Sequence, residues 1–201
     1  MRPHQRPKVD EFEGYFFLVA DEVTLQLPAD GDISASKDGE SDDDVQSRQL
    51  SAFLGPNYLV TVHIEPVKAV ANLRERCDHN HRLLEKGADY LLYMLLDGVV
   101  DGYFPLLDLL DDLMDNLEDR IVGKPEQGIL ETIFRLKRDL TRLRRFAAPL
   151  REVLQTLTTR DFPNIQQTTQ HQRLVLAIHD GVCGSSDLLV VASSPLGRII
   201  A

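Results

Sequence analysis

Two stretches in which apolar residues recur at alternating steps of four and three constrain this fold more than any other feature of the chain. An average spacing of about 3.5 residues keeps one apolar stripe facing a partner helix. Between the stretches, Gly123 provides a helix stop, and Pro125 suits the first turn of the next helix. Because short connections make neighbouring helices antiparallel, we expect an antiparallel, coiled-coil-like hairpin of Ala88–Val122 and Lys124–Arg160. The stripe comprises Leu92, Leu96, Val99, Tyr103, Leu106, Leu110, Leu113 and Leu117, then Ile129, Ile133, Leu136, Leu140, Leu143, Ala147, Leu150, Leu154 and Leu157.

The polar faces of the two predicted helices carry opposite charges. The first carries Asp97, Asp101, Asp108, Asp111, Asp112, Asp115, Glu118 and Asp119, and the second carries Arg135, Lys137, Arg138, Arg142, Arg144, Arg145 and Arg151. One interpretation is that ion pairs flank the seam, although exposed pairs contribute only about 0–1 kcal/mol each. The other is that the acidic face also collects divalent cations, because carboxylates three and four positions apart share a helix face and Mg²⁺ prefers oxygen ligands. The spacing does not choose between them.

Composition excludes several classes of protein. A net charge of −10 argues against a nucleic-acid-binding surface and favours attraction of cations. The two cysteines, Cys77 and Cys183, indicate a reducing compartment. The sequence shows no signal peptide and no apolar run of about 20 residues. We therefore expect a cytoplasmic chain without a transmembrane segment. No nucleophile–base pair or phosphate-binding glycine loop is present, so no enzyme is expected. His79 and His81, two positions apart, are expected at the surface and His63 half-buried in a strand.

Extended segments precede the predicted hairpin. Glu13–Leu27 begins with an aromatic apolar run and ends in strict alternation, and Leu50–Leu54 and Tyr58–Ile64 are predicted as two further strands. The segment 29–46 is rich in Pro, Gly, Ser and Asp and predicts an acidic loop. Gly55 and the two residues after it predict a turn between the last two strands.

The remaining elements predict an α+β fold, because strands are followed by helices. Pro66–Lys86 is expected to form a helix ended by Gly87, and Pro105 to kink the first helix of the hairpin. We therefore expect three parts: residues 1–87 as a partial α/β domain, 88–160 as the long hairpin, and 161–201 as a divergent segment of weak periodicity.

Several segments, in one order along the chain, resemble the cytoplasmic domain of CorA-type magnesium transporters. They are His4–Val9, Phe53–Thr61, Asp89–Tyr93, Leu96–Pro105, Leu136–Arg138 and Pro149–Leu154. The resemblance implies a partial α/β/α sandwich with a small mixed sheet, followed by the helix pair. It also implies homopentamers in which bound Mg²⁺ between cytoplasmic domains holds an ion pore closed. Asp97 falls at a family position associated with this regulatory metal, for which Co²⁺ is a second candidate.

The chain departs from the family pattern in three respects. The upstream acidic pair, the two transmembrane helices and the Gly-Met-Asn pore signature have no counterpart, and Asp180 or Asp187 matches the family's stalk-helix aspartate only after a frame shift. Residues 161–201 therefore resemble a stump of the stalk helix, and a truncation or frameshift near Gln167–Arg173 is one hypothesis. We expect a partial metal-sensing domain of a CorA-like Mg²⁺ or Co²⁺ transporter that associates with itself or with full-length subunits. The alternative is a stand-alone helical scaffold without metal dependence.

Overall fold

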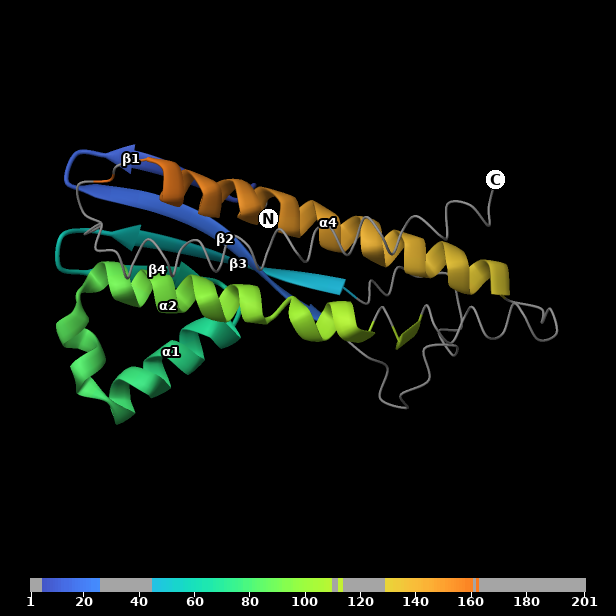
Figure 1. Ribbon diagram of the computed structural model, residues 1–201, viewed down its shortest axis with the longest axis horizontal. Helices are drawn as coiled ribbons and strands as arrows, with labels where there is room; N and C mark the ends of the chain where they lie inside the picture. The colour runs from blue at the N-terminus through green and yellow to red at the C-terminus, as the bar shows by residue number, and fades with distance from the viewer. Residues whose placement is uncertain (1–4, 26–44, 110–111, 114–128, 161, 163–201) are drawn as a thin grey trace.

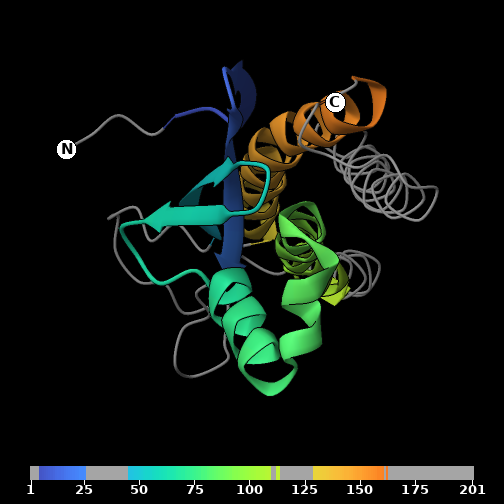
Figure 2. The same cartoon turned by 90° about the vertical axis from the view of Figure 1, so that its left-hand side faces the viewer.

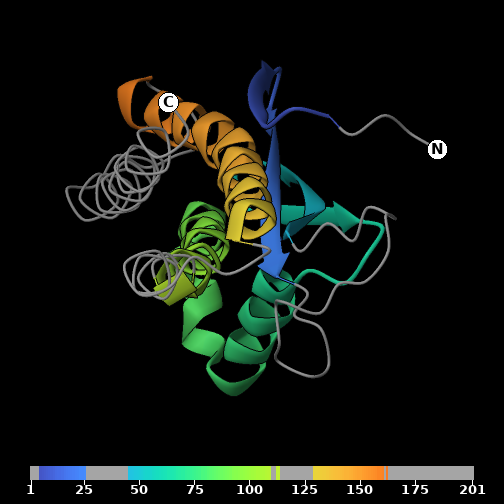
Figure 3. The same cartoon turned by 90° about the vertical axis from the view of Figure 1, so that its right-hand side faces the viewer.

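The computed structural model describes residues 5–25, 45–109, 112–113, 129–160 and 162. Within these residues, a four-stranded sheet carries two long helices on one of its faces (Figure 1). Views along the long axis place both helices on the same side of the sheet (Figures 2 and 3). The predicted α+β fold is therefore confirmed.

The sheet is a meander in the order β1-β2-β3-β4: β1 (Lys8–Phe12), β2 (Tyr15–Leu25), β3 (Val45–Leu54) and β4 (Leu59–His63). Each strand pairs antiparallel with the next, so the expectation of a mixed sheet is wrong for the described residues. Sequential pairing requires only short or hairpin connections, whereas a parallel pair needs a crossover of a dozen or more residues. Strand β1 was not predicted, because its only apolar residues, Val9 and Phe12, are three positions apart and do not alternate as in a strand.

The turns of the meander follow from their residues. Gly14 has a φ of 84°, which allows the two-residue loop that sets Phe12 opposite Tyr15. At the next described turn, the backbone N–H of Gly55 donates to the carbonyl of Tyr58 over 3.0 Å, as the Gly-Pro-Asn sequence predicts. The acidic loop expected at 29–46 lies outside the described residues except for its last two positions, Val45 and Gln46, which begin β3.

A short helix, α1 (Lys68–His79), and a 3-10 segment, η2 (His81–Lys86), replace the single helix expected over Pro66–Lys86. The break lies at Asn80, whose side chain accepts a hydrogen bond from the N–H of Arg82 and starts η2. Asparagine favours such local caps over a helix interior. Gly87, with a φ of 100°, separates η2 from the next helix.

Helix α2 (Ala88–Asp101) runs antiparallel to α4 (Ile129–Thr159) across the sheet (Figure 1). After a turn at Gly102 and Tyr103, the chain is helical again over residues 104–109. This interruption lies where the kink was predicted, because Pro105 has no N–H to donate to the carbonyl four positions earlier. The predicted tip of the hairpin falls mainly on residues 110–111 and 114–128, outside the described part.

Every seam residue of the two helices whose burial is described is buried, except the partly buried Leu113. The partner of the seam differs from the expectation, however. Helix α4 packs closely on β1, β2 and β3, and α2 packs on β2, β3 and β4. The two apolar stripes therefore share one core with Phe16, Leu18 and Leu50 of the sheet instead of forming a self-contained two-helix zipper. A stripe of this spacing specifies a buried helix face but not what covers it.

One helical segment, Ala88–Leu109, is long and apolar enough to cross a membrane by length and composition alone. Its Leu95 and Val99 are fully buried in the core shared with the sheet. A core helix with this burial passes the same test.

Candidate metal site

Asp97, the residue singled out by the sequence, lies on α2 and is half-buried. Tyr93 lies one turn before it and Asp101 one turn after it, so the three side chains share one side of the helix. The hydroxyl of Tyr93 donates a hydrogen bond to the carboxylate of Asp97. Leu96, directly before Asp97, and Val99, two positions after it, are buried in the core, which fixes the rotation of α2 and leaves Asp97 at the edge of the covered face.

The surroundings make ionisation of Asp97 unfavourable. Burial raises the pKa of the Asp97 carboxyl, the negative charge of Asp101 raises it further, and the Tyr93 hydrogen bond and the positive charge of Arg76 act in the opposite direction. Burial also raises the pKa of the Tyr93 phenol, with Asp97 as the next cause. A cation bound beside Asp97 and Asp101 would relieve the repulsion that the two carboxylates exert on each other.

Helix α1 supplies the cationic side of this site. It packs against α2, and Gly98 permits close approach, because a Cβ built at Gly98 would lie 3.4 Å from the Cβ of Ala69. This packing brings Arg76 within electrostatic range of Asp97. Tyr93 could have been found from its spacing to Asp97, whereas Arg76 comes from another helix and leaves no local signal in the sequence.

The donor set fits a weakly held, hydrated cation. Among the described residues, no group of three or more His, Cys, Asp or Glu side chains lies close enough to hold a metal. Mg²⁺ keeps several waters and is commonly bound through one or two carboxylates. Asp97 and Asp101 meet that requirement. Asp180, Asp187 and the acids of residues 38–44 lie outside the described part.

None of the described histidines, His63, His79 and His81, lies in a group of side chains that could hold a metal. His63, expected to be half-buried, is exposed at the end of β4, and its Nδ1 lies 2.8 Å from the carbonyl oxygen of Glu65. It is exposed because β4 is an edge strand of the described sheet. His79 and His81 are exposed, as predicted.

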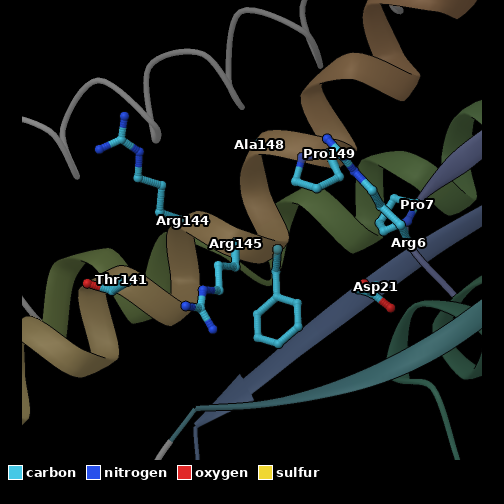
Figure 4. Close-up of a pocket in the computed structure, with 9 residues that line it drawn as sticks. Arg6, Pro7, Asp21, Thr141, Arg144, Arg145, Ala148 and Pro149 are labelled. Carbon is cyan, nitrogen blue, oxygen red and sulfur yellow. The ribbon is translucent and has the colours of Figure 1, made fainter. Parts of the chain in front are cut away.

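A concave region lies between the N-terminal segment, β2 and α4 (Figure 4). This hollow of about 580 Å³ is lined by Arg6, Pro7, Asp21, Thr141, Arg144, Arg145, Phe146, Ala148 and Pro149. The cations in it do not converge, because Arg144 and Arg145 point in different directions (Figure 4). Arg6 is paired with Glu152 at 3.1 Å. The hollow therefore lacks a focused set of groups for one small ligand.

Comparisons with known proteins agree on one family. The family model described as "CorA-like Mg2+ transporter protein" matches residues 1–182. The chain is 37% identical over 161 residues to the cobalt/magnesium transport protein CorA of Thermotoga maritima, a match covering 80% of this chain and 42% of that protein. It is 28% identical over 166 residues to a putative metal ion transporter of Bacillus subtilis, covering 83% of this chain and 47% of the relative. The chain thus spans less than half the length of these relatives.

Solved structures show the same fold. The soluble domain of CorA from Methanocaldococcus jannaschii superposes with a TM-score of 0.77 at 19% identity, over 98% of this chain and 72% of that chain. The ZntB cytoplasmic domain from Vibrio parahaemolyticus gives a TM-score of 0.62 at 11% identity, over 98% of this chain and 74% of that one. The named curated relatives are transporters, which supports a non-enzymatic role at the level of the family. The extent of the family match and the identity to the Thermotoga protein lead to one conclusion: this chain belongs to the CorA-like Mg²⁺ transporter family.

Proposed function

We propose that this chain is a cytoplasmic metal-sensing part of a CorA-like divalent metal ion transporter, with Asp97 as a ligand of a regulatory Mg²⁺ ion. The observation that carries the proposal is the half-buried carboxylate of Asp97, with its raised pKa and Asp101 one turn away. In this site Mg²⁺ supplies positive charge that offsets the repulsion between the carboxylates. Co²⁺, transported by the named Thermotoga relative, is the second cation to test.

The residues of the site have different roles in the proposed sensing of metal. Asp97 and Asp101 supply oxygen ligands, and Tyr93 orients the Asp97 carboxylate through its hydrogen bond. Arg76 stabilises the carboxylate when no metal is bound and competes with a metal for it. Because Arg76 belongs to α1 and Asp97 to α2, binding of a metal changes the electrostatic contact between these helices. Such a contact is the means by which the proposed sensor passes metal occupancy to the fold.

In the assembled transporter, we place this part at the cytoplasmic face of the membrane, within a homo-oligomer whose other contacts involve full-length subunits. The family resemblance suggests a pentamer. We propose the division of the chain into three parts, at residues 87 and 160, as part of the same assignment. A stand-alone scaffold without metal dependence is the competing function.

Thermal unfolding in a magnesium titration tests the proposal. A ligand that binds only the folded state stabilises it by RT ln(1 + [L]/Kd), so about 10 mM Mg²⁺ on a site with a Kd of about 1 mM adds about 1.4 kcal/mol. For a chain of this size that corresponds to a rise in Tm of about 3–6 °C. Asp97→Asn should lose this rise. Asp78→Asn, which removes the same charge from an exposed position of α1, should keep it.

The outcomes separate the two functions. A magnesium-dependent rise that Asp97→Asn abolishes and Asp78→Asn preserves supports the sensor. A Tm that does not respond to Mg²⁺ or Co²⁺ in the parent chain supports the metal-independent scaffold. A response that is equal in the parent and in Asp97→Asn removes Asp97 from the site.

A further inference from the structure

Helix α2 carries a row of aromatic side chains that leads to the candidate metal site. Tyr90, Tyr93 and Asp97 follow one another at spacings of three and four, so they lie on one side of the helix. Tyr90 and Tyr93 are both half-buried. Because side chains on a helix lean toward its N-terminus, Asp97 leans toward Tyr93, and Tyr93 leans toward Tyr90. The row therefore connects the start of α2 with the carboxylate of the site.

Each member of this row is in contact with the next. The ring centroids of Tyr90 and Tyr93 lie 5.9 Å apart and the ring planes are tilted by 46°, which is within the range of a favourable aromatic pair. The hydroxyl of Tyr93 donates to the carboxylate of Asp97. Lys86 is the last residue of η2, and its Nζ lies 4.3 Å from the centroid of the Tyr90 ring, as in a cation–π contact.

Gly87 sets the position of Lys86 relative to α2. Its φ of 100°, which few residues other than glycine adopt, turns the chain between η2 and α2. Its carbonyl accepts a hydrogen bond from the N–H of Leu91 over 3.4 Å. Segment η2 contacts both α1 and α2. Lys86 therefore belongs to the segment that joins the helix of Arg76 to the helix of Asp97.

We propose that Tyr90 and Lys86 are positioning residues of the candidate metal site. Lys86 restrains the ring of Tyr90, Tyr90 restrains the ring of Tyr93, and Tyr93 thereby holds the Asp97 carboxylate in one orientation. Neither Tyr90 nor Lys86 is itself a ligand. An aromatic pair of this kind changes an equilibrium constant by about 2- to 12-fold, and an exposed cation–π contact by about 2- to 5-fold. The benefit for a divalent cation rests on the proposed function, whereas the restraint on Asp97 does not.

A purely structural role for the row, as cover for one side of α2, predicts a different dependence on the side chains. It requires apolar surface at Tyr90 but no particular orientation of Tyr93, so Tyr90→Leu leaves the hydrogen bond to Asp97 as it is. Positioning instead requires a ring at position 90 and a cation at position 86, because both contacts depend on the face of an aromatic ring. Substitutions that keep or remove the ring and the cation therefore separate the two roles.

Tyrosine fluorescence of the full chain in EDTA tests the restraint without any contribution from metal. The chain has five tyrosines and no tryptophan, so its emission comes from tyrosine alone. A carboxylate that accepts the hydrogen bond of a phenol quenches the emission of that phenol, so Asp97→Asn should raise the emission of the parent. In the Tyr90→Leu background this rise should fall by about half or more, because Tyr93 has lost its support. In the Tyr90→Phe background, which lacks the same tyrosine but keeps the ring, the rise should match that of the parent.

The contribution of Lys86 is tested by the same rise in emission. Lys86→Met removes the charge and should reduce the rise, whereas Lys86→Arg keeps a cation for the Tyr90 ring and should preserve it. The control Lys137→Met removes a lysine charge from an exposed position of α4 and should leave the rise unchanged. Circular dichroism checks that each variant is folded. If Tyr90→Leu is not folded, Lys86→Met and Lys86→Arg, at an exposed position, decide the test.

A magnesium titration of the Tm extends the test to the proposed function. Tyr90→Leu should raise the apparent Kd for Mg²⁺ about threefold or more relative to Tyr90→Phe. An equal Kd in these two variants would remove the row from the metal response. A parent chain that does not respond to Mg²⁺ contradicts the proposed function, whereas the emission in EDTA alone decides the restraint on Asp97.

Three results in EDTA would overturn the inference or part of it. Asp97→Asn could leave the emission of the parent unchanged, which would mean that Tyr93 does not donate to Asp97 in solution. The rise could be equal in the Tyr90→Leu and Tyr90→Phe backgrounds, which would reduce the row to apolar cover of α2. A rise that Lys86→Met leaves unchanged would remove Lys86 from the positioning residues.

Discussion

Glu22 offers the sharpest test of how the sheet holds the first helix. Its carboxylate is buried on β2 and accepts hydrogen bonds from the backbone N–H groups of Lys68 and Ala69, over 2.9 and 2.7 Å. These groups belong to the first turn of α1, where the N-cap residue Val67 provides no side-chain cap. A carboxylate distant in sequence thus caps the N-terminus of α1, a role that a Ser, Thr, Asp or Asn side chain at the N-cap position normally has.

Glu22→Ala removes both hydrogen bonds and leaves two N–H groups of the helix terminus without this acceptor. A hydrogen bond to a charged group contributes about 1.5–3 kcal/mol, and a negative charge at a helix N-terminus adds about 0.3–1 kcal/mol. Because the hydrogen bond from the Lys68 N–H is only partly buried, we expect a loss of about 3 kcal/mol in the free energy of unfolding. Glu22→Gln keeps one acceptor oxygen without the charge and should lose about half as much.

Urea unfolding followed by circular dichroism measures this effect, with Glu11→Ala on the exposed part of β1 as the control. The control removes the same side chain and should change the free energy of unfolding by no more than about 0.5 kcal/mol. At this chain length, a loss of about 3 kcal/mol lowers the Tm by about 6–12 °C. If Glu22→Ala and Glu11→Ala unfold within 1 kcal/mol of each other, Glu22 does not cap α1 in the way described.

The remaining predictions concern the core, a backbone constraint and pH. Leu143→Ala in the fully buried face of α4 should destabilise by about 2–5 kcal/mol in urea unfolding, whereas Val60→Ala, half-exposed on β4, should cost far less. Gly87→Ala should cost about 1–3 kcal/mol in the same assay, because a φ of 100° is strained for alanine and the new Cβ would lie 2.7 Å from Asp89 Oδ1. The folded state raises the pKa of Asp97 above its ordinary value of 3.8. Ionisation of Asp97 therefore lowers the free energy of unfolding as the pH rises from 3.8 through the raised pKa. In EDTA, Asp97→Asn should be more stable than the parent at pH 7 and should lose this advantage near pH 3. A constant difference between the two across this range would contradict the raised pKa.

Apolar spacing predicted which helix residues are buried, but not which surface covers them. Leu143 and Leu150 are fully buried, as the steps of four and three require, yet α4 lies on the sheet. The same spacing fits a helix that faces another helix and one that faces a sheet. Strand β1 was missed for a different reason: Val9 and Phe12 are its only apolar residues, and their spacing of three is not the alternation of a strand.

The candidate site was predictable in part. The resemblance to the family singled out Asp97, and helical spacing could have added Tyr93 and Asp101. Arg76 could not have been found in this way, because its position depends on how α1 packs against α2 through Gly98 and Ala69. The capping role of Glu22 depends on tertiary structure as well, since 46 positions separate it from Lys68.

The proposed metal sensor depends on the depth of Asp97 in the fold. A fully exposed carboxylate loses little when ionised, so a cation gains little by binding it. A fully buried carboxylate would be closed to a hydrated Mg²⁺ ion, which gives up its waters reluctantly. Asp97 lies between these limits, where burial and Asp101 disfavour its charge while one side stays open to solvent. In the proposed sensor, a cation bound at Asp97 would relieve this unfavourable charge, and the free energy of that relief would be available to shift the contact between α1 and α2.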